Sequence, residues 1–260
     1  MKQRLLSGVI VVCCLAMAAS NCSNDSNPTG SLSILLRPAE FVATQSGTTV
    51  VLASFAQIFD TTNGLPMFSF TDTLTIQVMG DTLLRGEQAI KEITTRARGG
   101  AVLRFTIVDN DRVRVYSSPT DNTVFISIQA PIRIGTEWLS NPEDGPSANF
   151  LDLRKIEALD ASLTLPAGRF NNLMRISSRA VSSGQLVGTG ELYYAKGVGI
   201  IRSGFISMTR SGKKTQSSDF TALRVEKAFT PIAAKTSANS APDKQEVMPD
   251  PQNAWSGENR

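Results

Sequence analysis

The sequence predicts an all-β protein, a single antiparallel meander curved into a half-barrel or incomplete barrel. Three observations support this prediction. Apolar residues alternate with polar ones at every second position, as Leu74, Ile76 and Val78 do between threonines and a glutamine. Clusters of Gly, Asp, Asn and Pro interrupt the alternation at short intervals, which is typical of hairpin turns. Helical periodicity is confined to one short candidate, RPAEFVA at 37–43.

The β-rich domain is placed at residues 33–228, and its spacing suits a sandwich, a barrel or a strongly curved sheet of roughly ten or eleven strands. The run DTLTIQVMGD is expected to end at Gly80-Asp81, and AVLRFTIVDNDRVRVYSS is expected to form a hairpin that turns at 109–111. A dense turn cluster, NPEDGPSAN at 141–149, divides the domain in two. The other strand-like runs are TTVVLASFAQIF, EQAIKEITTRA, TVFISIQ, EALDASLTLP, NLMRISSRAV, QLVGTGELYYA, GIIRSGFISMTR and FTALRVEKAF.

Composition argues against several classes of function. The chain contains no histidine, which removes the His-assisted nucleophile and the His-ligated metal site. Outside the first four residues, 24 basic residues face 23 acidic ones, a balance that argues against a nucleic-acid-binding protein. We therefore expect no enzyme, no metal and no cofactor. A hydrolase that uses only carboxylates, such as Glu137, Asp144 and Asp152, is the alternative, but the sequence gives these residues no pairing geometry.

The first 21 residues form an export signal. Lys2 and Arg4 precede an apolar stretch that is too short to span a bilayer, and small residues follow it. The ending ASNC resembles the lipobox of bacterial lipoproteins, which implies that Cys22 is lipidated and becomes the mature N-terminus. Ordinary secretion, with cleavage near Ala18 and a free thiol at Cys22, is the alternative. We favour lipidation, because an exposed lone thiol in an exported protein is open to oxidation.

Polar, low-complexity segments flank the domain. Residues 22–32 are rich in Ser, Asn, Pro and Gly, as a flexible tether is. Residues 229–260 lose all periodicity, and we expect a disordered tail. Ser23 stands where lipoproteins of the inner membrane typically carry Asp. The lipoprotein resemblance therefore implies a lipid anchor in the bacterial cell envelope, at an outer membrane and facing the periplasm.

Two glycine-containing corners carry a second resemblance. The stretches TLTIQVMGDTLLRGEQAIK, IRIGTEWLS, LTLPAGRFNNLMRI and GELYYAKGVGIIRSG resemble β-rich bacterial envelope lipoproteins of undetermined function. In that group one strand ends in a Pro-Ala-Gly-x-Phe turn, here at Pro166 and Gly168, and another in an aromatic-Ala-x-Gly-Val-Gly corner, here at Gly197 and Gly199. The resemblance implies a half-barrel similar to the periplasmic lipoprotein-carrier fold, with structural rather than catalytic corners.

A stripe of arginines follows from the expected hairpin at 109–111. If three residues form the turn, Val108 faces Arg112, and the positively charged side chains lie opposite the apolar face. The residues of this stripe are Arg104, Arg112, Arg114 and Tyr116. Such a set could bind a carboxylate, a phosphate or a lipid headgroup. The alternative is a solvated outer face, which predicts Asp or Glu beside the arginines.

These observations lead to one expected function and one alternative. We expect a lipid-anchored envelope lipoprotein that binds an apolar or amphiphilic ligand, such as a lipid, in its curved sheet. Its expected contact with the membrane is the N-terminal lipid. The alternative is a non-catalytic structural protein that contacts an envelope partner through a sheet edge or the tail.

Overall fold

The computed structural model describes residues 36–120, 122–142 and 150–227. The predicted signal peptide (1–21), Cys22, the tether (22–32) and the tail (229–260) lie outside the described residues, as do Asp144 and most of the turn cluster at 141–149. The description below concerns the unit that begins at Leu36.

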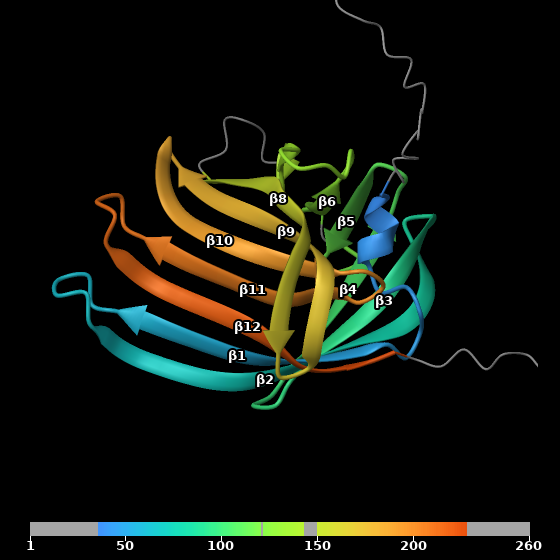
Figure 1. Cartoon of the computed structure of the whole chain (residues 1–260), viewed down its shortest axis with the longest axis horizontal. Helices are drawn as coiled ribbons and strands as arrows, with labels where there is room; N and C mark the ends of the chain where they lie inside the picture. Colours follow the sequence, from blue (N-terminus) through green and yellow to red (C-terminus); the bar gives the residue numbers. More distant parts are fainter. Residues whose placement is uncertain (1–35, 121, 143–149, 228–260) are drawn as a thin grey trace, which may run out of the picture. The chain divides into compact units, whose positions relative to one another are not determined.

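One sheet makes up almost the whole described unit (Figure 1). It is preceded by a short 3-10 helix, η1 (Pro38–Phe41), at the segment where the sequence predicted its single helical turn. Within the described residues, no helix has the length and apolar character needed to cross a membrane. The strands are β1 (Thr49–Phe59), β2 (Pro66–Leu84), β3 (Glu87–Arg96), β4 (Ala101–Val108), β5 (Arg112–Tyr116), β6 (Phe125–Gln129), β7 (Glu137–Leu139), β8 (Phe150–Leu165), β9 (Gly168–Ser182), β10 (Gln185–Ala195), β11 (Gly199–Met208) and β12 (Lys214–Glu226).

The predicted all-β class and the incomplete barrel are confirmed. The order in the sheet is β6-β5-β4-β3-β2-β1-β12-β11-β10-β9-β8-β7, with antiparallel pairing throughout. The topology differs from a single meander in one respect. The sheet consists of two meanders, β1–β6 and β7–β12, which are joined by the pairing of β1 with β12. The edges of the sheet also meet, because Ile126 N of β6 donates to Ser140 O beyond β7 at 2.7 Å. The barrel is therefore nearly closed.

Several strands are longer than predicted, since β8 begins at Phe150 rather than Glu157 and β12 at Lys214 rather than Phe220. The run expected to end at Gly80-Asp81 continues to Leu84, because a bulge between Val78 and Gly80 absorbs the glycine within β2. Strand β7 was not predicted, since its three residues are too few to show an alternation. It is fixed at the edge of the sheet by Trp138, whose indole Nε1 donates to Ile126 O at 2.9 Å.

Most of the core lies on one face of the sheet, which we call the inner face, while a smaller buried cluster with Phe105, Ile107 and Tyr116 lies on the other face of β3–β5. Ile156 of β8 pairs with Ile176 of β9, and both are fully buried against residues of β2, β3, β5 and β6. A second cluster forms where the β8–β9 hairpin folds over the inner face, so that Ala167 N at its tip donates to Ala222 O of β12 at 3.2 Å. The buried residues of this second cluster are Val50, Leu52, Leu74, Leu165, Leu173, Ala195, Val198, Ile201 and Ala222.

The four predicted corner residues lie in two hairpin turns. Pro166 and Ala167 separate β8 from β9, and Gly168 follows with a φ of 120°. Gly197, with a φ of 66°, lies in the turn between β10 and β11, and Gly199, with a φ of 92°, begins β11. The second corner is thus a reversal between two strands rather than a kink within the sheet.

Candidate functional site

The inner face of β8–β11 lines a partly open cavity of about 290 Å³, which we call the apolar chamber. Strands β6, β8, β9, β10 and β11 all contribute to its wall. Its apolar lining consists of Phe125, Phe150, Ala180, Leu192 and Phe205, and its polar lining includes Asp152, Arg154, Ser178 and Ser203. A mostly apolar wall with a few fixed polar groups is the usual composition of a small-molecule site.

Glycines of β10 shape this chamber by letting an aromatic ring lie against the backbone. A Cβ at Gly188 would stand 2.5 Å from Cζ of Phe205, and one at Gly190 would stand 2.8 Å from Cδ2 of the same ring. Only glycine allows this approach, because a methyl group would displace the ring. The ring of Phe205 is thereby held against the strand as part of the chamber wall.

An ion pair forms the polar side of the apolar chamber. Arg154 Nη2 lies 3.0 Å from Asp152 Oδ2, and each side chain is only 15% exposed. Ser178 Oγ donates to the other carboxylate oxygen, Oδ1, at 2.6 Å. Arg154 Nη1 also donates to Ser127 O at 3.3 Å. Because both charged groups are paired and hydrogen-bonded, the pair is a fixed element of the wall.

A second cavity of about 100 Å³, which we call the polar chamber, lies between the η1 segment, β3–β5 and the β10–β11 turn. Its polar lining consists of Glu92, Arg104, Thr106, Ser127 and Tyr194. Arg154 links the two chambers, because it lines the first and donates to the carbonyl of Ser127, which lines the second.

Tyr194 is the most unusual residue of the polar chamber. Its side chain is 3% exposed, and its hydroxyl has no hydrogen-bond partner in the described part of the chain. Burial raises the pKa of this phenol. A buried hydroxyl without a partner loses its hydration without compensation, so it marks a place where a partner of another kind can bind.

Glu92 and Arg104 face each other across β3 and β4 in the same chamber. Burial raises the pKa of the Glu92 carboxyl, although the charge of Arg104 and a hydrogen bond from Thr106 act in the opposite direction. Across the resolved segments Arg104 has no ion pair with a carboxylate, whereas Arg154, Arg114, Arg175 and Arg202 each have one.

The structure corrects the predicted arginine stripe. Val108 pairs with Val113 rather than Arg112, so the hairpin register is one residue away from the prediction. Asp109 N donates to Arg112 O at 2.9 Å and closes the turn one residue later than expected. A shift of one residue in the pairing moves every side chain of β5 to the opposite face relative to β4. Arg104 therefore lies on the inner face, whereas Arg114 and Tyr116 lie on the opposite face, beside their partners Ile107 and Phe105. Arg104 is thus separated from the other three residues of the stripe.

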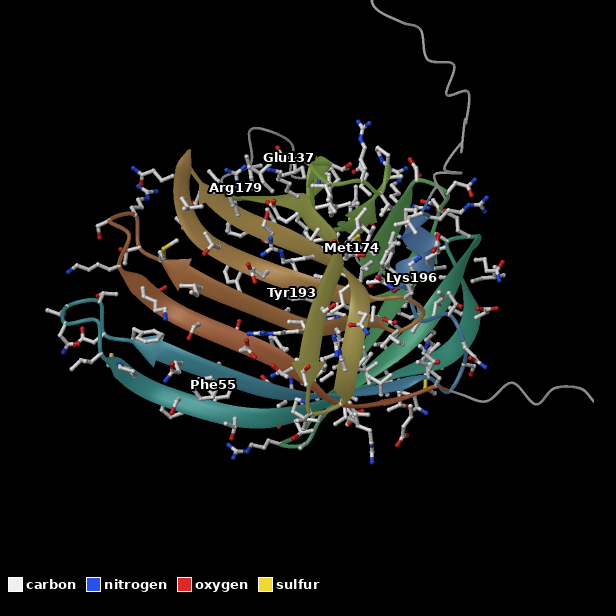
Figure 2. The ribbon with its side chains drawn as sticks, viewed as in Figure 1. Phe55, Glu137, Met174, Arg179, Tyr193 and Lys196 are labelled. Carbon is white, nitrogen blue, oxygen red and sulfur yellow. The ribbon has the colours of Figure 1, made fainter. Side chains whose placement is uncertain are left out.

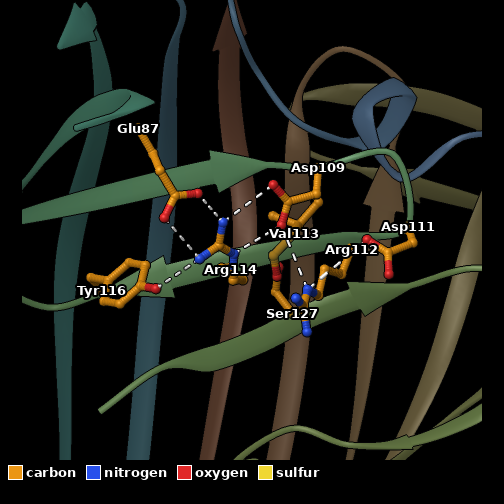
Figure 3. A network of polar contacts seen from close by, with 8 residues as sticks. All are labelled: Glu87, Asp109, Asp111, Arg112, Val113, Arg114, Tyr116 and Ser127. Atoms are coloured by element: carbon orange, nitrogen blue, oxygen red, sulfur yellow. Dashed lines mark hydrogen bonds and ion pairs between the residues drawn. The ribbon is translucent and has the colours of Figure 1, made fainter. Parts of the chain in front are cut away.

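Carboxylates surround the remaining arginines of the stripe (Figure 3). Arg114 forms ion pairs with Glu87 and with Asp109, and its guanidinium also donates to the Tyr116 hydroxyl at 3.2 Å. The hydrogen bonds that the guanidinium donates to Glu87 and then to Asp109 raise the pKa of Arg114. Arg112 lies 3.6 Å from Asp109. These acids are the neighbours that the solvated-face alternative predicted, and they leave no acid-free surface for an anion.

The largest hollow described, of about 730 Å³, lies on the outer face across β8–β12 and the end of β1. Phe55 of β1, Glu137 of β7 and Arg179 of β9 line it, and Figure 2 shows how far apart in the sheet they lie. Within its lining, Lys155 pairs with Glu137 at 3.7 Å and with Glu157 at 3.9 Å. Unlike the polar chamber, it contains no buried polar atom without a partner among the described side chains.

Sequence reasoning named Arg104 but missed Tyr194, Glu92 and Arg154. Tyr194 stood within the quoted corner motif but was interpreted as a corner residue only. Arg154 and Asp152 did carry a signal, because they occupy the same alternate positions as the core residue Ile156. Charged residues in the apolar phase of a strand indicate a buried polar site. No group of His, Cys, Asp or Glu able to hold a metal ion occurs in the described ranges.

Comparisons with known proteins find likeness only among solved structures. No family model and no curated protein matches the sequence. A protein described as exported, with a YmcC-like fold, from Bacteroides fragilis gives a TM-score of 0.44 at 14% identity, over 73% of this chain and 100% of that one. A protein described as a lipoprotein from Parabacteroides distasonis gives 0.36 at 13% identity, over 72% and 99%. A domain described as an outer membrane lipoprotein-sorting protein from Vibrio parahaemolyticus gives 0.23 at 7%, over 70% and 85%.

Proposed function

We propose that this protein is a bacterial envelope lipoprotein, anchored through Cys22, that binds an apolar or amphiphilic ligand on the inner face of its sheet. The export signal and the lipobox-like ASNC support the location. One observation supports the ligand above all others: an apolar cavity of about 290 Å³ lies on the inner face of the nearly closed sheet, and Arg154 of its wall donates a hydrogen bond to Ser127 O in the wall of a second cavity.

The composition of these chambers favours binding over catalysis. The acid of the apolar chamber, Asp152, is held by Arg154 and Ser178, so it is not available as a base or nucleophile. The aromatic side chains of Phe125, Phe150 and Phe205 offer hydrocarbon contact instead. We therefore propose a carrier or receptor of an amphiphile rather than a hydrolase.

The ligand is tested by extraction from the chain that begins at Ser23. All twelve strands and the three core clusters lie between residues 36 and 227, so this chain keeps every contact of the described residues. We expect organic extraction and mass spectrometry of the purified protein to yield an amphiphile. We also expect the protein to bind the fluorescent probe N-phenyl-1-naphthylamine.

A matched pair of variants locates the binding. Ser203 lines the apolar chamber, whereas Arg202 beside it points to the outer face. Ser203→Trp should displace the probe and the extracted amphiphile, and Arg202→Trp should leave both in place. Circular dichroism checks that both variants are folded. A wild-type protein that yields no amphiphile and does not bind the probe would refute the ligand-binding function.

The anchor is tested separately. Mass spectrometry of the membrane fraction should show an acylated N-terminal cysteine in the wild type, and Cys22→Ala should release the protein into the soluble fraction. An unmodified N-terminus near residue 19 would instead indicate ordinary secretion.

A second candidate function rests on the exposed β1–β2 hairpin. Strand β3 pairs with β2 only from Leu74 onward, so the stretch Pro66–Asp72 has β1 as its one strand partner among the described residues. Large apolar side chains of this hairpin are exposed, and they are Ile58, Leu65, Met67, Phe68 and Phe70. An apolar strand edge is a surface to which an envelope partner could add a strand. Photo-crosslinking from position 67 in cells would capture such a partner.

A further inference from the structure

We propose that the ligand of the inner chambers carries an anionic headgroup, a carboxylate or a phosphate, that binds the Arg104 guanidinium and the Tyr194 hydroxyl in the polar chamber. The apolar part of the ligand then lies in the apolar chamber. This inference rests on the proposed function and adds the chemical class of the ligand.

Arg104 supplies the positive charge. It lines the polar chamber from β4, and no hydrogen bond or ion pair with it occurs within the described ranges. Arginine binds carboxylate and phosphate oxygens through two parallel donors, so an unpaired guanidinium in a cavity favours an anion of this shape.

Tyr194 supplies an independent observation from another part of the sheet. Its hydroxyl, on β10, is buried in the wall of the same chamber without a partner. After burial, the charges that affect the phenol are those of Arg154, then Asp152, then Arg104, so Tyr194 lies near both arginines. An oxygen of the headgroup would accept the phenolic O–H and satisfy this buried donor.

The Glu92 carboxyl could pair with Arg104 in place of the ligand's anionic headgroup, but its surroundings disfavour this pairing. The two residues are cross-strand partners, yet they do not form an ion pair. Burial favours the protonated form of the Glu92 carboxyl. A protonated carboxyl donates a hydrogen bond, so Glu92 can assist an anion rather than repel it.

The sizes of the two chambers suit different parts of an amphiphile. The polar chamber, about 100 Å³, has room for a small headgroup, and the apolar chamber, about 290 Å³, has room for hydrocarbon. Arg154 lines the apolar chamber and donates a hydrogen bond to Ser127 O, which lines the polar chamber. A ligand that occupies both chambers would therefore contact the Arg154 side chain. An amphiphile with one acidic end fits this order of surfaces.

The test compares three probes of equal chain length: dodecanoate, dodecyl phosphate and dodecanol. Each competes with N-phenyl-1-naphthylamine for the chain that begins at Ser23. We expect at least one of the two anions to bind about tenfold or more tightly than dodecanol, because an anion accepts charge-assisted hydrogen bonds from Arg104, an exposed residue, and one more from the buried Tyr194 hydroxyl. The anion with the higher affinity identifies the headgroup as carboxylate or phosphate.

Three variants assign the preference to the proposed residues. Arg104→Gln should remove the preference for anions while leaving dodecanol binding unchanged, and Arg104→Lys should restore part of it. Tyr194→Phe should weaken anion binding about threefold to tenfold. Arg112→Gln, on the same hairpin but in its exposed turn, is the matched control and should change nothing.

The outcomes separate this inference from the proposed function. If the wild type binds dodecanol as tightly as both anions, or if Arg104→Gln keeps the preference, the headgroup assignment is wrong while ligand binding stands. If the wild type binds neither the fluorescent probe nor any of the three compounds, the proposed function fails together with the inference.

Discussion

The β8–β9 and β1–β2 hairpins are built from the same kind of alternating sequence and end in opposite environments. The tip of β8–β9 folds onto the inner face, where Leu173 is fully buried and Ala167 reaches the backbone of β12. The tip of β1–β2 extends past β3, and Met67 and Phe68 are 71% and 58% exposed. Figure 1 shows the first hairpin crossing the sheet and the second reaching beyond it.

This difference shows that alternating apolar residues identify a strand with one apolar face, but they do not show whether another part of the protein covers that face. The β8–β9 hairpin stabilises the fold, because its apolar residues leave water when the chain folds. The rings of Phe68 and Phe70 lie 6.1 Å apart, and the two residues are 58% and 38% exposed. An exposed apolar patch of this kind is more useful for docking than for stability.

The largest contrast is expected for truncation of one apolar residue in each hairpin. Leu173→Ala removes a fully buried side chain from the second core cluster and should lower the free energy of unfolding by about 2–5 kcal/mol. Met67→Ala should change it by less than about 0.5 kcal/mol. Denaturant unfolding of both variants measures the difference. Equal effects would show that the two hairpins contribute alike to stability.

Glycines at the two tips sharpen the comparison. Gly168 has a φ of 120°, a value that side-chain-bearing residues rarely adopt, whereas Gly64 has a φ of 74°, close to the left-handed helical region. Gly168→Ala should destabilise the protein by about 1–3 kcal/mol. Gly64→Asn should be nearly neutral, because asparagine tolerates that region. Thermal unfolding of both variants tests this order, and a larger loss for Gly64→Asn would reverse it.

Much of the fold could be predicted because strands leave a local signal. The alternation in β1 and in β8–β12 was visible in the sequence, and so was the single helical turn at Pro38–Phe41. The pairing of β1 with β12 could not be predicted, since it joins segments more than 150 residues apart. Local patterns do not specify which distant strands become neighbours.

The site was harder to predict than the fold because it depends on register. Arg104 was identified as an anion-binding candidate, but with Arg112, Arg114 and Tyr116 as companions. A one-residue error at the 109–111 turn moved it to the other face. Its companion in the structure, Tyr194, comes from β10 and reaches the same chamber only because the sheet curls until its two halves face each other.

A smaller effect is expected near the tip of the exposed hairpin, where Phe59 pairs with Pro66. Lys214 Nζ lies 4.6 Å from the centroid of the Phe59 ring, a cation–π contact between β12 and β1. Lys214→Gln should lower the free energy of unfolding by about 0.5–1 kcal/mol. Arg210→Gln, in the neighbouring turn, is the control and should have no comparable effect. Urea unfolding compares the two variants, and equal losses would argue against the contact.

The smallest effect on folding is expected where the exposed patch itself is removed. Met67→Ser combined with Phe68→Ser should change the free energy of unfolding by less than about 0.5 kcal/mol for each residue, because both side chains are already in water. If the patch is a docking surface, the same pair should abolish crosslinking to an envelope partner from a neighbouring position such as Ser69. Leu173→Ala at a permissive temperature should preserve that crosslinking. A double variant that unfolds as readily as Leu173→Ala would show that the patch belongs to the core after all.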